Sequence, residues 1–143
     1  MGEIEQPVAE AIAGYCAAVR AKDVDAFTAL FAEDVRVFDM WGSWTHDGID
    51  AWRGMAEAWF GSLGDEQVAV EFQEVDSFVA GDVAVASAIL TFRGLSAAGE
   101  ELRSLDNRLT WALRRTDDGW RIVHEHTSAP LDEEARAIFR RER

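Results

Sequence analysis

The chain has little of three things: cysteine, positive charge and long hydrophobic runs. Its single cysteine, Cys16, excludes an internal disulfide, so we expect a cytoplasmic protein. Fourteen Lys and Arg stand against 27 Asp and Glu, a net charge of −13, which disfavours nucleic acid and anionic membranes as partners. No apolar stretch approaches the ~20 residues of a membrane span. The opening MGEIEQ lacks the layout of a signal peptide.

What is present indicates a folded globule. The 143 residues suggest one domain over 1–143, and 48% of them are hydrophobic against 29% charged. Six Trp and eight Phe are many for this size. These rings either fill a large core or line a pocket.

Helical periodicity dominates the first half of the chain. Apolar residues recur at three- and four-residue steps over 4–19, which predicts a helix with one buried face. Asp23 is placed to cap a second helix with an apolar stripe at 27–31. Asp47 is placed to cap a third, over 49–63. We also expect a short helix in the closing LDEEARAIFRRER.

Strand patterns fill the remainder. In VRVFD, residues Val35, Val37 and Asp39 share one face of a short strand. The later strands form an antiparallel meander, with a bulge expected near Glu74 and a central strand in VAVASAILTF. This order predicts an α+β domain in which N-terminal helices cover a curved, cone-shaped antiparallel sheet around a cavity.

The last two strands, roughly 101–115 and 120–128, are joined by a turn at 116–119. This turn places even positions of the first strand on the same face as odd positions of the second. One face then carries Asp106, Arg108 and Thr110 with Val123, Glu125 and Thr127; the other carries Leu109, Trp111 and Leu113 with Trp120, Ile122, His124 and His126.

Each face has two readings. The face with Asp106, Arg108 and Thr110 is either a solvated surface or a polar cluster inside the cavity, with Arg108 as an anion binder. The face with Leu109, Trp111 and Leu113 is either packed in the apolar core or part of a dimer interface. We expect a homodimer, because Trp111 and Ile122 would otherwise form an exposed apolar patch. His124 and His126 could ligate a metal, but no third ligand is evident because His46 lies far away in the sequence. We therefore predict no metal.

Two segments carry a family resemblance. The stretch AFTALFAEDVRVFDMWGSWTHDGIDAWRGMAEAWFGSL resembles the front half of SnoaL-like and ketosteroid-isomerase-like proteins of the nuclear-transport-factor-like superfamily. The stretch RLTWALRRTDDGWRIVHEHTSAP resembles the closing hairpin of SnoaL-like proteins, and also the association domain of calmodulin-dependent protein kinase. The resemblance implies the cone-shaped fold. It leaves the reaction open, because the superfamily includes isomerases, cyclases, dehydratases, epoxide hydrolases and binding modules.

The ketosteroid-isomerase resemblance implies particular roles. Asp39 falls where that family has its catalytic base, and Tyr15, the only tyrosine, falls where it has a phenol donor. Asp106 is the nearest match to the family's third member, an acid on a late strand. Tyr15 as a core residue and Asp39 as an ordinary strand-end residue remain the alternatives.

These residues predict a small enzyme without a cofactor, an isomerase or polyketide cyclase type, that abstracts a proton next to a carbonyl of a hydrophobic small molecule. Asp39 would be the base, with Tyr15 or Arg108 stabilising the oxyanion. The expected ligand contacts are Trp41, Trp52, Trp59, Phe60, Glu125 and His126. One alternative is a non-catalytic binding or oligomerisation module using Arg108 with Glu125. Another is an epoxide hydrolase using Asp39, Arg108 and Asp106.

Overall fold

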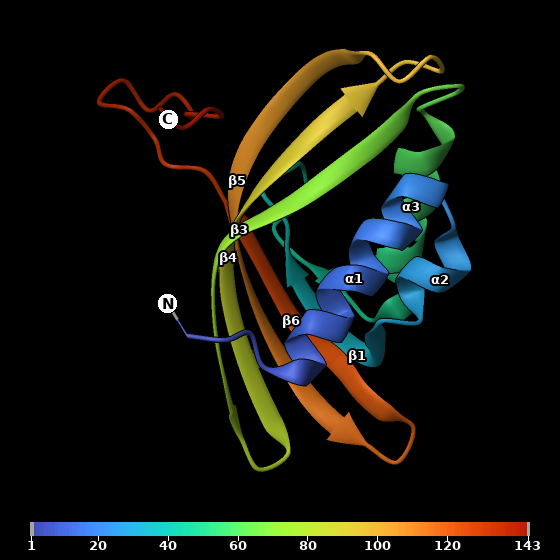
Figure 1. The fold of residues 1–143 in the computed structure, drawn as a ribbon, viewed down its shortest axis with the longest axis vertical. Coiled ribbons are helices and arrows are strands. Elements are labelled where there is room, and N and C mark those ends of the chain that lie inside the picture. Colours follow the sequence, from blue (N-terminus) through green and yellow to red (C-terminus); the bar gives the residue numbers. More distant parts are fainter. Residues whose placement is uncertain (1, 143) are drawn as a thin grey trace.

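The computed structural model describes residues 2–142, which form three helices and one six-stranded sheet (Figure 1). The helices are α1 (Gln6–Ala21), α2 (Val24–Thr28) and α3 (Ile49–Gly61). The strands are β1 (Phe31–Phe38), β2 (His46–Asp47), β3 (Gln67–Ala80), β4 (Val83–Leu95), β5 (Glu101–Thr116) and β6 (Gly119–Ser128). The strand order is β2-β1-β6-β5-β4-β3.

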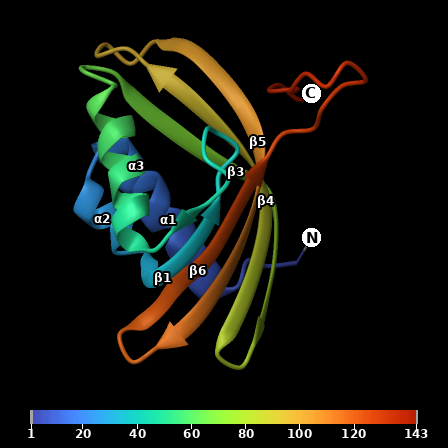
Figure 2. The same cartoon turned by 180° about the vertical axis from the view of Figure 1, so that it is seen from behind.

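The sheet is strongly curved, and the three helices lie in its hollow while the C-terminal segment lies on the opposite side (Figures 1 and 2). Seen from behind, β1 runs beside β6, the one parallel pair among antiparallel neighbours within residues 2–142 (Figure 2). The predicted α+β class, with N-terminal helices covering a curved sheet, is confirmed. No helix in this part of the chain is long and apolar enough to cross a membrane.

The helical predictions are confirmed in part. Asp23 caps α2 by accepting a hydrogen bond from the Ala26 amide at 3.0 Å. The second helix is shorter than predicted, because Phe31 already begins β1 and packs its ring on Phe27 from there, with 5.2 Å between centroids. The predicted cap at Asp47 is wrong. Gly48 precedes α3 with a φ of 87°, a left-handed conformation that favours glycine, and Asp47 lies in β2.

The meander follows the prediction closely. The β3–β4 pairing shifts between Gln73 and Asp76, which confirms the bulge near Glu74. Strand β4 lies between β3 and β5, as expected of a central strand. The helix expected in the closing segment is wrong. That segment folds back over the outer face of the sheet, where the Asp106 amide donates to the Phe139 carbonyl at 2.6 Å.

The closing hairpin corrects the predicted faces. Arg115 lies opposite Trp120, as the turn predicts, but between Ala112 and Leu113 the pairing shifts by one residue. Since side chains alternate along a strand, one extra residue in β6 moves every later side chain to the other face. Glu125 and Thr127 therefore join Trp111 and Leu109 on the inner face, and Asp106, Arg108 and Thr110 lie on the outer face.

Candidate functional site

A cavity of about 560 Å³ lies between the helices and the concave face of the sheet. This volume suits a small organic molecule. Most of the wall surface is apolar, with polar side chains set among the apolar ones. The lining side chains include Tyr15, Asp39, Trp41, His46, Trp52, Met55, Trp59, Leu63, Val68, Phe92, Arg103, Leu105, Asn107, Glu125 and Thr127.

Asp39 directly follows β1 and faces inward through the predicted alternation with Val35 and Val37, both fully buried. The Thr127 hydroxyl donates to Asp39 Oδ1 at 3.1 Å. Burial raises the pKa of Asp39, and the Thr127 bond, the charge of nearby His46 and backbone amides oppose that rise in part. A carboxylate with a raised pKa is a better proton acceptor than one in water.

Glu125 is the second carboxyl group of the cavity, and only 2% of the residue is exposed. Burial raises its pKa to about 7. The Trp111 indole N–H, which donates to Glu125 Oε1 at 2.8 Å, opposes that rise, while the nearby charge of Asp39 adds to it. Near neutral pH a large share of Glu125 therefore carries a proton that it can donate.

Tyr15 places its ring from α1 among Phe27, Phe72 and Trp111, with centroids 5.4, 5.7 and 5.8 Å away. Burial, followed by the charges of Glu125 and Asp39, holds its pKa well above the usual value. The phenol therefore keeps its proton and can act as a hydrogen-bond donor at the cavity wall. Tyr15 belongs to the core and also lines the cavity, so its place in the core is compatible with the predicted role as a phenol donor.

His46 is a site residue that sequence reasoning did not identify. Strand β2 pairs it with Val37 in β1. This pairing brings His46 to the cavity wall beside Asp39, with its ring 5.3 Å from that of Trp52. A two-residue strand is too short for its pattern to be seen, so the chain offered no signal beyond the proximity of His46 to Asp39 in sequence.

Four of the six expected ligand contacts line the cavity. Trp41, Trp52, Trp59 and Glu125 are on its surface. Phe60 lies in the core instead, with its ring edge-on to Phe27 at 5.7 Å.

The other misplaced side chains are on the outer face. Arg108 is exposed, and its Nε donates to the Ser128 hydroxyl at 3.0 Å. His126 is also exposed, with its ring 5.4 Å from that of Phe38. Asp106 lies on the same outer side beneath the C-terminal segment. The bulge in β6 turned Glu125 inward and His126 outward, whereas Asp106 and Arg108 lie outward because they alternate in β5 with the inward-facing Leu109 and Trp111.

These placements remove the side-chain sets of both alternative functions. Arg108 and Glu125 lie on opposite faces, so they form no joint anion site, and neither Arg108 nor Asp106 joins Asp39 in a set for epoxide hydrolysis. Trp111 and Ile122 are fully buried, so they provide no exposed patch for the expected dimer. Within residues 2–142, no group of three or more His, Cys, Asp or Glu is placed to hold a metal ion.

The cavity combines three groups that differ in their tendency to hold a proton. Asp39 is half-buried and has hydrogen bonds that favour its ionised form, the pKa of the deeply buried Glu125 is about 7, and Tyr15, also deeply buried, has a pKa well above its usual value. Separated proton affinities of this kind allow one group to accept a proton while its neighbours donate hydrogen bonds.

Fold and site together define a small α+β domain with an acidic, aromatic cavity. The chain belongs to the SnoaL-like domain family, which matches residues 8–132. A search of curated proteins found no match.

Solved structures of the nuclear transport factor 2-like (NTF2-like) superfamily share this fold. An NTF2-like protein of unknown function from Pseudomonas putida KT2440 has a TM-score of 0.84 and 27% identity, covering 97% of this chain and 96% of that one. An NTF2-like protein from Novosphingobium aromaticivorans, described as having a cystatin-like fold, has a TM-score of 0.74 and 22% identity over 91% and 84% of the two chains. A superfamily member from Salmonella enterica serovar Typhimurium has a TM-score of 0.70 and 21% identity over 90% and 92%.

Proposed function

We propose that the chain is a small enzyme that needs no cofactor and abstracts a proton next to a carbonyl group of a hydrophobic molecule. The result would be an isomerisation or an aldol-type cyclisation. One observation carries this proposal: a half-buried carboxyl group, Asp39, shares an aromatic cavity with two deeply buried groups, Tyr15 and Glu125, that can donate a hydrogen bond when they are protonated.

In this mechanism Asp39 accepts the proton from the carbon next to the carbonyl, and the developing enolate oxygen accepts hydrogen bonds from Tyr15 and protonated Glu125. The hydrogen bond from Thr127 orients the Asp39 carboxylate. Glu125 would therefore be the second group that stabilises the enolate, a role for which the sequence suggested Asp106 and Arg108. The mostly apolar walls lower the local polarity, which strengthens the hydrogen bonds to the enolate.

The proposal predicts catalysed exchange of an activated carbonyl compound that fits the cavity. 2-Tetralone, a two-ring ketone with acidic α-protons, can be incubated with the protein in D₂O and its α-proton signals followed by NMR. The wild-type chain should accelerate exchange above the buffer rate, and Asp39→Asn should abolish the acceleration. Binding of 2-tetralone without exchange would contradict the enzymatic proposal and favour a ligand-binding domain.

A further inference from the structure

The cavity has one positively charged side chain from lysine or arginine within the described part of the chain, Arg103 on β5. Along the inner face of β5 it is followed by Leu105 and Asn107, which also line the cavity. Neither the proposed base nor the two proposed donors use this charge.

The position of Arg103 is specific. Its partner across the sheet is Gly94 on β4, and a Cβ atom at position 94 would lie only 3.2 Å from Arg103 Cζ. The arginine side chain therefore lies across the glycine, in close contact with the position that a Cβ atom would take. Beyond Gly94 its guanidinium pairs with Glu66, whose amide bonds to the carbonyl of Leu63 at 2.9 Å, just after α3. Arg103 thus spans one end of the cavity, from β5 to the segment after α3.

The acidic groups lie further along β5, beside the middle of this strand. Leu109 lies opposite Thr127, whose hydroxyl holds Asp39. Arg103 and Leu109 are six positions apart in β5, which is about 20 Å along an extended strand. Apolar side chains, among them Phe92 and Leu105, line the cavity between Arg103 and the acidic groups.

We propose that Arg103 is an anion-recognition residue, and that the natural ligand has an anionic group, such as a carboxylate, at the end of its apolar body remote from its reactive carbonyl. This inference rests on the proposed function for the identity of the reactive end. In the empty protein Glu66 pairs with Arg103, and the ligand's anion takes over that pairing.

The energetics permit this exchange. An ion pair as exposed to solvent as that of Arg103 with Glu66 adds little to stability, because water screens both charges. A guanidinium has five N–H donors and can hold a carboxylate through two parallel hydrogen bonds. On a chain with a net charge of −13, an anionic ligand is repelled elsewhere, which makes a single cationic cavity residue selective.

The test uses two fluorescent probes that differ by one sulfonate: 8-anilinonaphthalene-1-sulfonate (ANS) and the neutral N-phenyl-1-naphthylamine (NPN). Fluorescence titration gives the Kd of each and their ratio. Arg103→Met should weaken ANS about tenfold, and Glu66→Gln should strengthen it about threefold. NPN should change less than about twofold in either variant.

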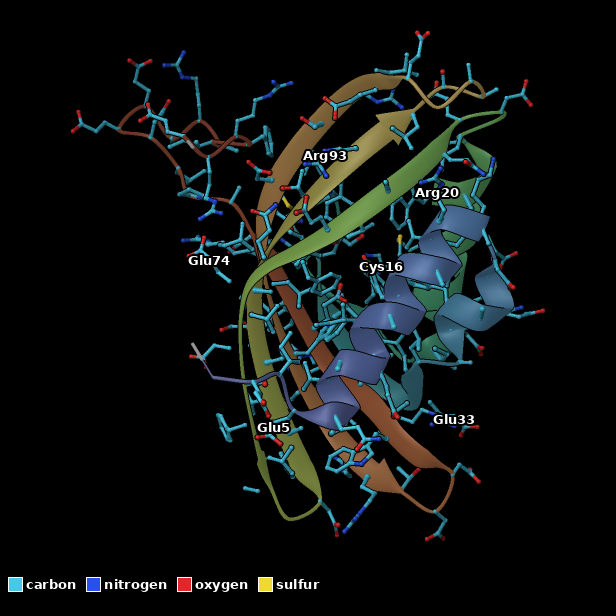
Figure 3. All side chains as sticks on the ribbon, viewed as in Figure 1. Glu5, Cys16, Arg20, Glu33, Glu74 and Arg93 are labelled. Atoms are coloured by element: carbon cyan, nitrogen blue, oxygen red, sulfur yellow. The ribbon has the colours of Figure 1, made fainter. Side chains whose placement is uncertain are left out.

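The Arg93 pair with Glu71 provides a matched control. Arg93 is adjacent to Gly94 in β4 (upper part of Figure 3), does not line the cavity, and pairs with Glu71 at 2.9 Å. Arg93→Met and Glu71→Gln change the net charge equally and should leave the ANS/NPN ratio unchanged. Equal effects of Arg103→Met and Arg93→Met, or a loss of ANS affinity in Glu66→Gln, would overturn the proposal. Because the readout is binding, failure of 2-tetralone exchange would refute the proposed function without deciding this test.

Discussion

Two buried carboxyl groups on neighbouring strands face opposite sides of the sheet. Asp106, 7% exposed, accepts hydrogen bonds from the Thr91 hydroxyl at 2.6 Å and the Arg141 amide at 2.8 Å beneath the C-terminal segment. Glu125, 2% exposed, borders the cavity and accepts a bond from Trp111. Asp106 and Glu125 are therefore both buried, but the groups around them differ. A carboxylate that fastens a chain segment has its oxygens occupied, whereas one that borders a cavity keeps bonding capacity for a ligand.

The C-terminal segment strengthens this contrast. Arg141 also pairs with Glu74 at the β3 bulge, on the side of the sheet away from the helices (Figure 3). The outer polar groups thus hold the closing segment to the sheet. The inner polar groups surround a space of about 560 Å³.

The largest expected effect comes from removing one carboxylate on each side. Asp39→Asn should lower the enzyme-dependent exchange rate of 2-tetralone about 10³-fold, because an amide cannot accept the proton. Asp106→Asn should leave the rate per folded molecule unchanged. NMR exchange rates measure the effect, and circular dichroism gives the folded fraction. Equal losses in the two variants would contradict the division between the faces.

The second prediction concerns stability and pH. The folded-state pKa of Glu125, about 7, lies above its usual 4.5, so the folded protein binds this proton more tightly than the unfolded chain. Its contribution to stability is present below about pH 4.5 and is lost as the pH rises through about 7, a change of about 3 kcal/mol. Glu125→Gln should remove that change.

Urea unfolding of wild type and Glu125→Gln at about pH 5 and about pH 8 measures this difference. Asp39, whose pKa is also raised, contributes in the same direction in both proteins, so the difference between them measures the Glu125 carboxyl group together with its charge interaction with Asp39. An identical pH dependence of the free energy of unfolding in the two proteins would show that Glu125 is not the group involved.

The third prediction tests the phenol donor. Tyr15→Phe removes one hydrogen bond to the enolate oxygen and should slow 2-tetralone exchange about 100-fold. The ring contacts with Phe27, Phe72 and Trp111 can remain, so the thermal midpoint should change little. An unchanged exchange rate would make Tyr15 a packing residue alone.

The smallest effect is expected on the outer face. Arg108→Gln should alter the exchange rate by less than about twofold, because Arg108 contacts Ser128 in solvent and not the cavity. The same NMR measurement decides this. A large loss of rate would restore the oxyanion role that the sequence suggested for Arg108.

The candidate site was predictable where alternation runs without interruption. Val35, Val37 and Asp39 alternate through β1, so the inward direction of Asp39 followed from the pattern. Tyr15 followed from the helical stripe of α1 together with the family resemblance. The faces of β6 were predicted wrongly beyond the hairpin end, because the turn chemistry fixes pairing only as far as the first bulge.

Local periodicity and composition determined the order of helices and strands, the α+β class and the supply of aromatic side chains for a cavity, because these depend on residues close together in the chain. Only the tertiary structure decided which carboxyl group enters that cavity with Asp39. One extra residue in β6 turned Glu125 inward, and a two-residue strand brought His46 to its side. Both depend on pairing between distant segments, which no local pattern encodes.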